Sequence, residues 1–339
     1  MRRGAKRDAE VMGRDMSVGE ARVILRTRAE LLDRDVPISS LRSDAAGGWH
    51  RVQRGVYVPR DAVDDLWPQA DLRLRVVAAA TQMRGGGAVF SHASAAVIHG
   101  LALSGIANRP VEMTVLGDVR MSSRSGLTRH LDELSSDDIV EVDGIRCTTM
   151  ERTVFDVARV ASLETGVSCA DAAARRMAVR ERVFDSDAQD VWRQRMRARA
   201  AAASGRRGVA RARWVIEFFD GRAELPGESL SRLQLFRLGY RSFDLQVPIE
   251  GPEGESYAVD IGLSDAKTFW EFDGEGKYLD QAMRSGRALE DVLLREKRRE
   301  DWIRGVTQWR LCRGGFRDVA TPEALAARLA AFGVPRPRV

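Results

Sequence analysis

The 339-residue chain lacks any hydrophobic run close to the roughly 20 residues that a membrane-spanning helix needs. Its N-terminus, MRRGAKRDAEVMGRD, also lacks the apolar stretch of a secretory signal peptide. We therefore expect neither a membrane span nor Sec-type secretion.

Cysteine is scarce. Cys147, Cys169 and Cys312 are far apart in the sequence, and none belongs to a CxxC pair. This spacing excludes a zinc ribbon and argues against a disulfide framework. We expect a protein of the reducing cytoplasm.

Histidine and lysine are also rare, and both are unevenly placed. The four histidines all lie at or before His130, so chemistry in the C-terminal half must depend on carboxylates and lysine. Arginine outnumbers lysine by 50 to 4, yet Lys267, Lys277 and Lys297 fall within 31 residues. Lysine can release its proton where arginine cannot, so this grouping hints at chemistry. The net charge of +5 is compatible with a nucleic-acid partner.

The N-terminal region predicts a winged helix-turn-helix over residues 17–60, after a mobile tail over 1–16. Capping boxes at Ser17–Glu20 and Thr27–Glu30 predict helices over 18–25 and 28–34. A third helix is expected over 38–46, followed by short strands over 49–52 and 56–58.

A winged helix of this kind predicts specific DNA contacts. Helix 38–46 would enter the major groove and offer Ser39, Ser40 and Arg42, while Arg51 and Arg54 of the wing would contact the backbone or the minor groove. The alternative is that the domain has this fold but binds protein.

The middle of the chain predicts a small α/β domain over 61–163 and an Arg-rich helical connector over 164–221. The Asp143-Gly144 turn between two short apolar runs is a strong hairpin signal. We expect His92 and His99 to be packing or capping residues, because no cysteine or acidic pattern accompanies them; the alternative is that they are metal ligands. The connector has no acid between Val191 and Ile216 and should form two helices there. The expected elements are helices over 69–83, 92–99 and 150–162 and strands over 88–90, 111–116, 139–142 and 145–148.

The last segment, 222–332, predicts an α/β domain with a mixed sheet. Helices are expected over 228–238, 287–305 and 321–332, and strands over 244–249, 256–263, 267–272 and 307–312. The whole chain is thus expected to be a multidomain α/β protein.

Carboxylates on two neighbouring strands are the most informative feature of this segment. Strict alternation places Asp260 opposite the hydrophobic face of its strand, and Glu271 and Asp273 opposite that of Trp270 and Phe272. Clustered carboxylates repel one another unless a cation lies between them, and oxygen ligands favour Mg²⁺ or Mn²⁺. The alternative is a solvated sheet face.

Two helices could complete such a site. Glu228 lies in the first turn of its helix, either as a further metal ligand or as an acid that complements the helix dipole. On the helix over 287–305, charged residues share the stripe expected to be buried, so this helix should face the carboxylates; a solvated face is the alternative. The apolar members of the stripe are Leu289, Val292, Leu293 and Ile303, and the charged ones are Glu296, Arg299 and Glu300, with Lys297 beside them.

The motifs ESLSRLQLFRLG, YAVDIGL, WEFDGEGKY, LREKRRED and TQWRLCRGGFRD resemble the PD-(D/E)XK nuclease superfamily, in its Vsr-like (very-short-patch-repair-like) branch and actinobacterial relatives. The resemblance covers about 222–318 and implies a restriction-endonuclease-like fold. It implies that Asp260 and Glu271 bind the metal with Glu228 as the helix acid.

The segment departs from that pattern at two points. Asp273 occupies the position where the superfamily usually has lysine, so it could be a further ligand, with the lysine's role passing to Lys277 or Lys297. The histidine that the Vsr type uses is absent.

Residues 17–163 resemble AbiEi-type antitoxins. The winged helix is matched by VGEARVILRTRAELLDRDVPISSLRSDAAGGWHRVQRGVYVP, and the domain after it by SHASAAVIHGL and CTTMERTVFDVAR.

Together these patterns lead us to expect a DNA-binding protein with an Mg²⁺- or Mn²⁺-dependent endonuclease domain, acting in phage defence or a toxin–antitoxin system. Such a protein could form a homodimer and pair with a toxin or defence partner. The first alternative is an antitoxin-like repressor with a catalytically silent nuclease fold. The second is a protein–protein scaffold without salt-dependent DNA affinity.

Overall fold

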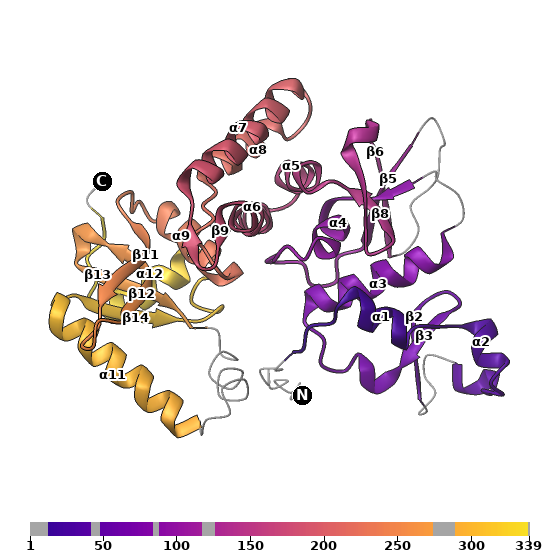
Figure 1. Cartoon of the computed structure of the whole chain (residues 1–339), viewed down its shortest axis with the longest axis horizontal. Helices are drawn as coiled ribbons and strands as arrows, with labels where there is room; N and C mark the ends of the chain where they lie inside the picture. Colours follow the sequence, from indigo (N-terminus) through magenta and orange to yellow (C-terminus); the bar gives the residue numbers. More distant parts are fainter. Residues whose placement is uncertain (1–12, 42–47, 84–87, 117–125, 274–288, 338–339) are drawn as a thin grey trace, which may run out of the picture. The chain divides into compact units, whose positions relative to one another are not determined.

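The computed structural model describes residues 13–41, 48–83, 88–116, 126–273 and 289–337 (Figure 1). It is a mixed α/β protein with several sheets, as expected in outline. The chain divides into two compact units: one contains Ile106–Asp156 and the chain up to Leu101, and the other contains Ala102–Gly105 and Val157–Val339. Residues 17–60 and most of 61–163 therefore fall in the first unit, whereas 102–105, 157–163, the connector and the C-terminal segment fall in the second. None of the described helices combines the length and the hydrophobicity that a membrane span requires.

The first unit begins with short helices whose caps were predicted correctly. α1 (Val18–Ile24) and α2 (Arg28–Leu32) both have complete capping boxes. β1 (Arg26–Thr27), β2 (Trp49–Gln53) and β3 (Val56–Pro59) form a sheet in the order β1-β3-β2. Of the third helix expected over 38–46, the structure shows a 3₁₀ turn, η1 (Ile38–Leu41), and residues 42–46 lie outside the described residues.

Residues 13–16 correct the expectation of a mobile tail. The Arg14 N–H donates to the Asp65 carbonyl, and Met16 is 1% exposed. The buried Arg73 forms a 2.6 Å ion pair with Asp15. This segment is therefore packed against the domain, while residues 1–12 lie outside the described residues.

A five-stranded mixed sheet, in the order β6-β5-β4-β8-β7, forms the rest of this unit. β7 (Ile139–Val142) and β8 (Ile145–Thr148) coincide with the predicted hairpin. β6 (Leu127–Leu131) was missed, because its sequence LTRHL has no apolar alternation. The other elements are β4 (Ala88–Phe90), β5 (Val111–Val115), α3 (Pro68–Gln82) and α4 (His92–Ile98). The boundary between the two units falls within α5 (Met150–Val160), after Asp156.

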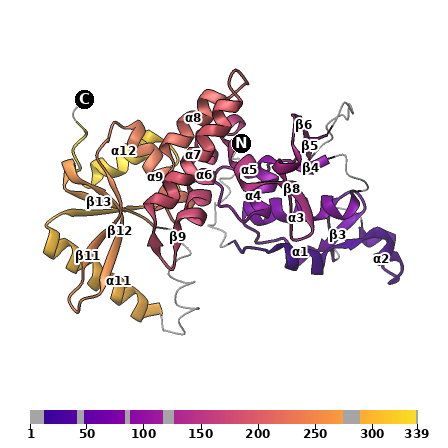
Figure 2. The same cartoon turned by 45° about the horizontal axis from the view of Figure 1, so that its top comes forward.

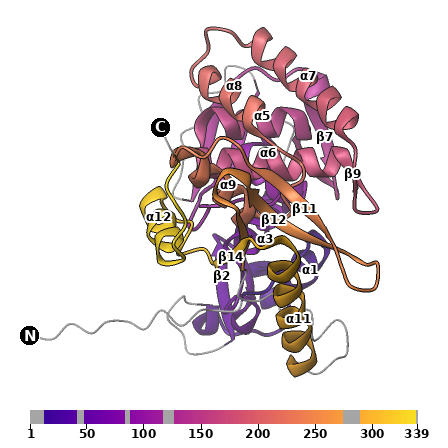
Figure 3. The same ribbon diagram turned by 90° about the vertical axis from the view of Figure 1, so that its left-hand side faces the viewer.

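The second unit begins with a helical layer. This layer consists of three helices that pack side by side (Figure 3): α6 (Leu163–Ala178), α7 (Ser186–Ala202) and α8 (Val209–Phe218). A two-stranded antiparallel ribbon, β9 (Val179–Arg180) and β10 (Val183–Phe184), connects α6 to α7. α7 and α8 are separate helices, as expected for the connector. Several of its arginines bind within this layer: Arg193 donates to the Ile216 carbonyl, Arg211 to the Ala161 carbonyl, and Arg197 pairs with Glu217.

The C-terminal sheet has the order β11-β12-β13-β14 and lies between helices. α9 (Pro226–Arg237) and α12 (Pro322–Ala331) pack in the core on one face, and α11 (Leu289–Thr307) covers the other (Figure 2). β11 (Asp244–Glu250), β12 (Ser256–Leu263) and β13 (Thr268–Phe272) are antiparallel neighbours, and β14 (Arg310–Gly314) is parallel to β13.

The end of α11 corrects the sequence prediction. The helix was expected to stop at 305 but passes through Gly305 to Thr307, whose hydroxyl donates to the Ile303 carbonyl. Gln308 then adopts a φ of 56°, a left-handed conformation that ends the helix and delays the strand to Arg310. Leu293, expected in the buried stripe, is 48% exposed, whereas Val292 and Ile303 are buried.

The three cysteines are all buried and free. Burial raises the pKa of the Cys147 and Cys169 thiols to about 12, and that of Cys312 to about 11. These side chains pack as small hydrophobic groups rather than as nucleophiles.

Candidate functional site

The strand register of the C-terminal sheet brings the predicted acids together. Ile261 pairs with Trp270, so continuing the register by one residue places Asp260 opposite Glu271. Glu271 pairs in turn with Arg313 of β14, and the pairs on both sides of Gln246 place it opposite Asp260. Gln246, Asp260, Glu271 and Arg313 thus form a row, one residue from each strand, that we call the polar row.

A break in alternation produces this row. Leu245 and Ile261 belong to the core under α9 and α12, whereas Val247 and Val259 belong to the core under α11. Gln246 has a φ of 51°, outside the β region. The side chains on either side of this point therefore face opposite sides of the sheet, instead of the same side as in a regular strand. The strict alternation predicted for the strand of Asp260 is therefore wrong, because Val259 and Ile261 lie in different cores, although Asp260 still lies away from the core of Trp270.

Asp260 is held at the end of its strand pair. Its Oδ2 atom accepts a 2.8 Å hydrogen bond from the Phe272 N–H. Because the bond is to the residue after Glu271, it fixes the Asp260 carboxylate beside Glu271.

Glu228 reaches the same row from α9. Its side chain is 3% exposed, and its Oε2 atom accepts hydrogen bonds from the Glu224 N–H at 2.9 Å and from Gln246 Nε2 at 3.2 Å. The interpretation of Glu228 as an inward-pointing acid is consistent with this burial. Glu228, Asp260 and Glu271 are not, however, among the described groups of three side chains whose ligand atoms all lie within 4.8 Å of one another.

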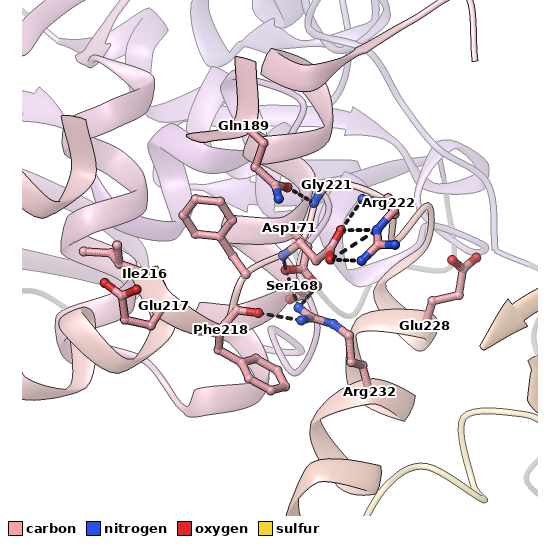
Figure 4. A network of polar contacts seen from close by, with 12 residues as sticks. Ser168, Asp171, Gln189, Ile216, Glu217, Phe218, Gly221, Arg222, Glu228 and Arg232 are labelled. Atoms are coloured by element: carbon pink, nitrogen blue, oxygen red, sulfur yellow. Dashed lines mark hydrogen bonds and ion pairs between the residues drawn. The ribbon is translucent and has the colours of Figure 1, made fainter. Parts of the chain in front are cut away.

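A buried ion pair fixes the turn of α9 that carries Glu228 (Figure 4). Arg232 donates two hydrogen bonds to Asp171 of α6, at 2.7 and 2.9 Å, and both side chains are 5% exposed or less. Arg232 also donates to the Phe218 carbonyl and lies 4.2 Å from the centre of the Phe218 ring. Figure 4 shows Arg232 reaching toward Asp171, whereas Glu228 ends away from that ion pair. The two residues are four positions apart, so their side chains leave the same face of α9 one turn apart.

Glu271 is engaged by two arginines. Its Oε1 atom accepts from Arg299 Nη2 at 2.6 Å, and its Oε2 atom accepts from Arg313 Nε at 2.9 Å. Glu296 of α11 bonds both guanidiniums. Burial lowers the pKa of Arg299, but Glu271 and Glu296 outweigh it and leave that pKa above its ordinary value. The prediction that α11 faces the carboxylates is thus confirmed.

The remaining predicted residues of this site lie less centrally. Lys297 is exposed on α11, and Lys277 lies outside the described residues. Asp273 is half-buried directly after β13, and its N–H donates to the Gly314 carbonyl at 2.9 Å. Among the described residues, the cations that contact Glu271 are arginines, and sequence reasoning missed Arg313 and Gln246. The alternation of β14 could have indicated Arg313, but no sequence signal marks the reversal at Gln246.

The described residues predicted to contact DNA lie in η1 and in the β2–β3 hairpin. Ser39 is exposed in η1, and the Ser40 hydroxyl donates to the Pro37 carbonyl at 2.7 Å. Arg51 in β2 and Arg54 in the β2–β3 turn are exposed, and Arg42 lies outside the described residues. Arg51 and Arg54 thus remain accessible to a partner.

The chain is similar in sequence to two curated proteins, and their names state no function. Two proteins of Mycobacterium tuberculosis are each 31% identical over 227 residues, which is 67% of this chain and 74% of the relative. They bear the names uncharacterized protein MT2308 (strain CDC 1551 / Oshkosh) and uncharacterized protein Rv2248 (strain H37Rv). No family profile matches the chain. No solved structure matches it either.

Proposed function

This chain belongs to the family of the Mycobacterium tuberculosis proteins MT2308 and Rv2248, and for it we propose the function of a DNA-binding, divalent-metal-dependent endonuclease. The proposal depends on one observation: the Asp260 carboxylate accepts from the N–H of Phe272, the residue next to Glu271, and Glu228 is bonded to Gln246 on the neighbouring strand. The resemblance of 222–318 to PD-(D/E)XK nucleases of the Vsr-like branch supports the same assignment.

The donor set suits a hard cation. Asp260 and Glu271 supply carboxylate oxygens from adjacent strands, which are the ligands that Mg²⁺ or Mn²⁺ prefers. When bound, the ion would supply Lewis-acid activation of a water and of the phosphodiester. Asp260 and Glu271 would bind it, and Glu228 would orient Gln246 and the end of the row.

Arginine takes the cationic role in this proposal. Arg299 and Arg313 already neutralise Glu271, so a cation bound there would release at least one guanidinium. A planar guanidinium binds phosphate through two parallel hydrogen bonds and could hold the charge that develops on it. Lys277 and Lys297 are the alternative cations that the sequence suggested.

The test is cleavage of DNA by the full chain with Mg²⁺ or Mn²⁺. We expect Asp260→Asn and Glu271→Gln each to lower the cleavage rate about 100-fold or more, as expected for the loss of a preorganised electrostatic group. Asp265→Asn is the matched control, because Asp265 is an exposed acid in the turn η4 (Ser264–Ala266) between the same two strands. Absence of metal-dependent cleavage by the wild type, or equal rates for the three variants, would contradict the proposal.

A second candidate function is an AbiEi-like repressor with a silent nuclease fold. The observation that favours it is the pairing of Glu271: both of its carboxylate oxygens form ion pairs, one with Arg299 and the other with Arg313. These ion pairs can stabilise the fold without any metal. This candidate predicts DNA binding that is unchanged by EDTA, together with no cleavage. Gel shift and cleavage assays on one preparation separate the two functions.

A further inference from the structure

A cluster of two histidines and a glutamate lies in the other compact unit, far in sequence from the polar row. His92, Glu112 and His130 each offer one ligand atom, and these atoms all lie within 4.8 Å of one another. We call these three residues the His–Glu cluster. Among the described residues, it is the group of at least three such side chains whose ligand atoms lie this close together.

The three side chains come from separate elements on one side of the sheet. His92 is the first residue of α4, and Glu112 and His130 belong to the parallel neighbours β5 and β6. Glu112 and His92 are each 5% exposed, whereas the His130 side chain is 24% exposed and gives access from solvent. Three ligands from three elements, with one open side, are typical of a metal site that keeps a coordination position free.

Hydrogen bonds already orient the two buried members. Ser91 Oγ lies 2.9 Å from His92 Nδ1, and Thr114 donates to that Ser91 oxygen at 2.9 Å. A contact at Nδ1 fixes the orientation of the His92 ring, as the outer partners of metal-binding histidines do. Glu112 Oε2 accepts from the Ala93 N–H at 3.2 Å. Burial raises the pKa of Glu112, but His130, His92 and Arg109 outweigh it, and the pKa is lower than usual.

From this geometry we propose that His92, Glu112 and His130 form a binding site for Zn²⁺. Two imidazoles and one carboxylate are ligands that zinc accepts, and three protein ligands leave a fourth position for water. His92 also has a φ of 54°, a conformation rare for histidine that its contacts must hold in place.

Binding requires one local movement. The rings of His92 and His130 are stacked, with centroids 3.7 Å apart and planes 21° from parallel. A bound ion must lie near the plane of each ring, so one ring has to turn out of the stack. His130 can turn because it is part-exposed and lies on β6 at the end of the strand order, whereas His92 is buried and bonded to Ser91.

The experiment is titration of the metal-free full chain with Zn²⁺ by calorimetry, and with Co²⁺ by visible absorption. We expect one ion per chain, a four-coordinate Co²⁺ spectrum, and a higher Tm with Zn²⁺. Glu112→Gln and His130→Ala should each weaken binding by at least about 100-fold, because loss of even an outer-shell partner costs 10–100-fold. Circular dichroism of both variants establishes that they are folded.

Two controls make the result specific. His50→Ala removes an exposed histidine of β2 and should leave the affinity unchanged. Asp260→Asn should also leave zinc binding unchanged. The zinc proposal can therefore be tested independently of the proposed nuclease activity. A wild type that binds no ion, or one whose affinity is the same in Glu112→Gln and His130→Ala, would overturn the proposal, as would loss of binding in either control.

Discussion

At the scale of single residues, one buried arginine and two half-buried ones hold the parts of the second unit that matter for the proposed site. Arg232 bridges α9 to Asp171 of α6, and Arg299 and Arg313 bridge α11 and β14 to Glu271. Sequence reasoning identified Asp260, Glu271 and Glu228, because strand alternation and a helix start reveal acids of this kind. It could not identify Arg232 or Asp171 as partners, because 61 residues separate them and no local pattern records the contact.

Removal of one partner from the Asp171–Arg232 pair should be costly. We expect Arg232→Leu to lower the free energy of unfolding by roughly 3–5 kcal/mol, because Asp171 would be left as an uncompensated buried charge. Urea denaturation measures the change. Arg197→Leu is the matched control: Arg197 pairs with Glu217 on the surface, with both side chains 53% exposed, and its loss should cost no more than about 1 kcal/mol. Equal losses in the two variants would show that the Asp171–Arg232 pair is not a buried charge pair in solution.

At the scale of elements, local signals predicted most of the helices and strands, and tertiary effects explain the exceptions. Capping boxes and the Asp143-Gly144 turn are local chemistry, so their elements appear where expected. β6 is held by pairing with β5 rather than by its own alternation. The exchange of faces at Gln246 depends on a single left-handed residue, which hydrophobic periodicity cannot reveal.

The contact between α9 and β13 depends on a glycine. A Cβ atom at Gly227 would overlap the Phe272 ring, so α9 can approach the sheet this closely only without a side chain there. We expect Gly227→Ala to cost about 1–3 kcal/mol of stability by overpacking and, by displacing Glu228, to slow the proposed cleavage.

Gly305→Ala is the control for that prediction. Gly305 lies inside α11, and apart from its chain neighbours and the nearby backbone of its own helix, no described atom comes within 4 Å of the place where an added Cβ atom would lie. Alanine there should therefore stabilise the protein by about 0.5–1 kcal/mol. Thermal denaturation of both variants checks the opposite signs, and a neutral Gly227→Ala would contradict the close contact.

At the scale of the whole molecule, the mild positive charge and the exposed Arg51 and Arg54 of the β2–β3 hairpin lead us to expect salt-dependent DNA binding. The net charge of +5 favours association with a polyanion but carries no sequence information. Family membership adds that the mycobacterial relatives should share whichever activity is found.

Arg51→Gln with Arg54→Gln should weaken DNA binding and reduce the slope of log affinity against log salt by about 2, since two phosphate contacts are lost. Fluorescence anisotropy at several salt concentrations measures the slope. Arg197→Gln is the control, because Arg197 is engaged by Glu217. An unchanged slope in the double variant would show that Arg51 and Arg54 do not contact the DNA phosphates.

All three cysteines are buried, so the reactivity of their thiols can report local unfolding of the protein. Cys147 belongs to the first compact unit, and Cys169 and Cys312 belong to the second. Because none of these thiols reaches solvent in the folded state, a maleimide can label each one only when its surroundings open. Mass spectrometry of labelled peptides at increasing denaturant would therefore follow the two units separately, without any engineered probe.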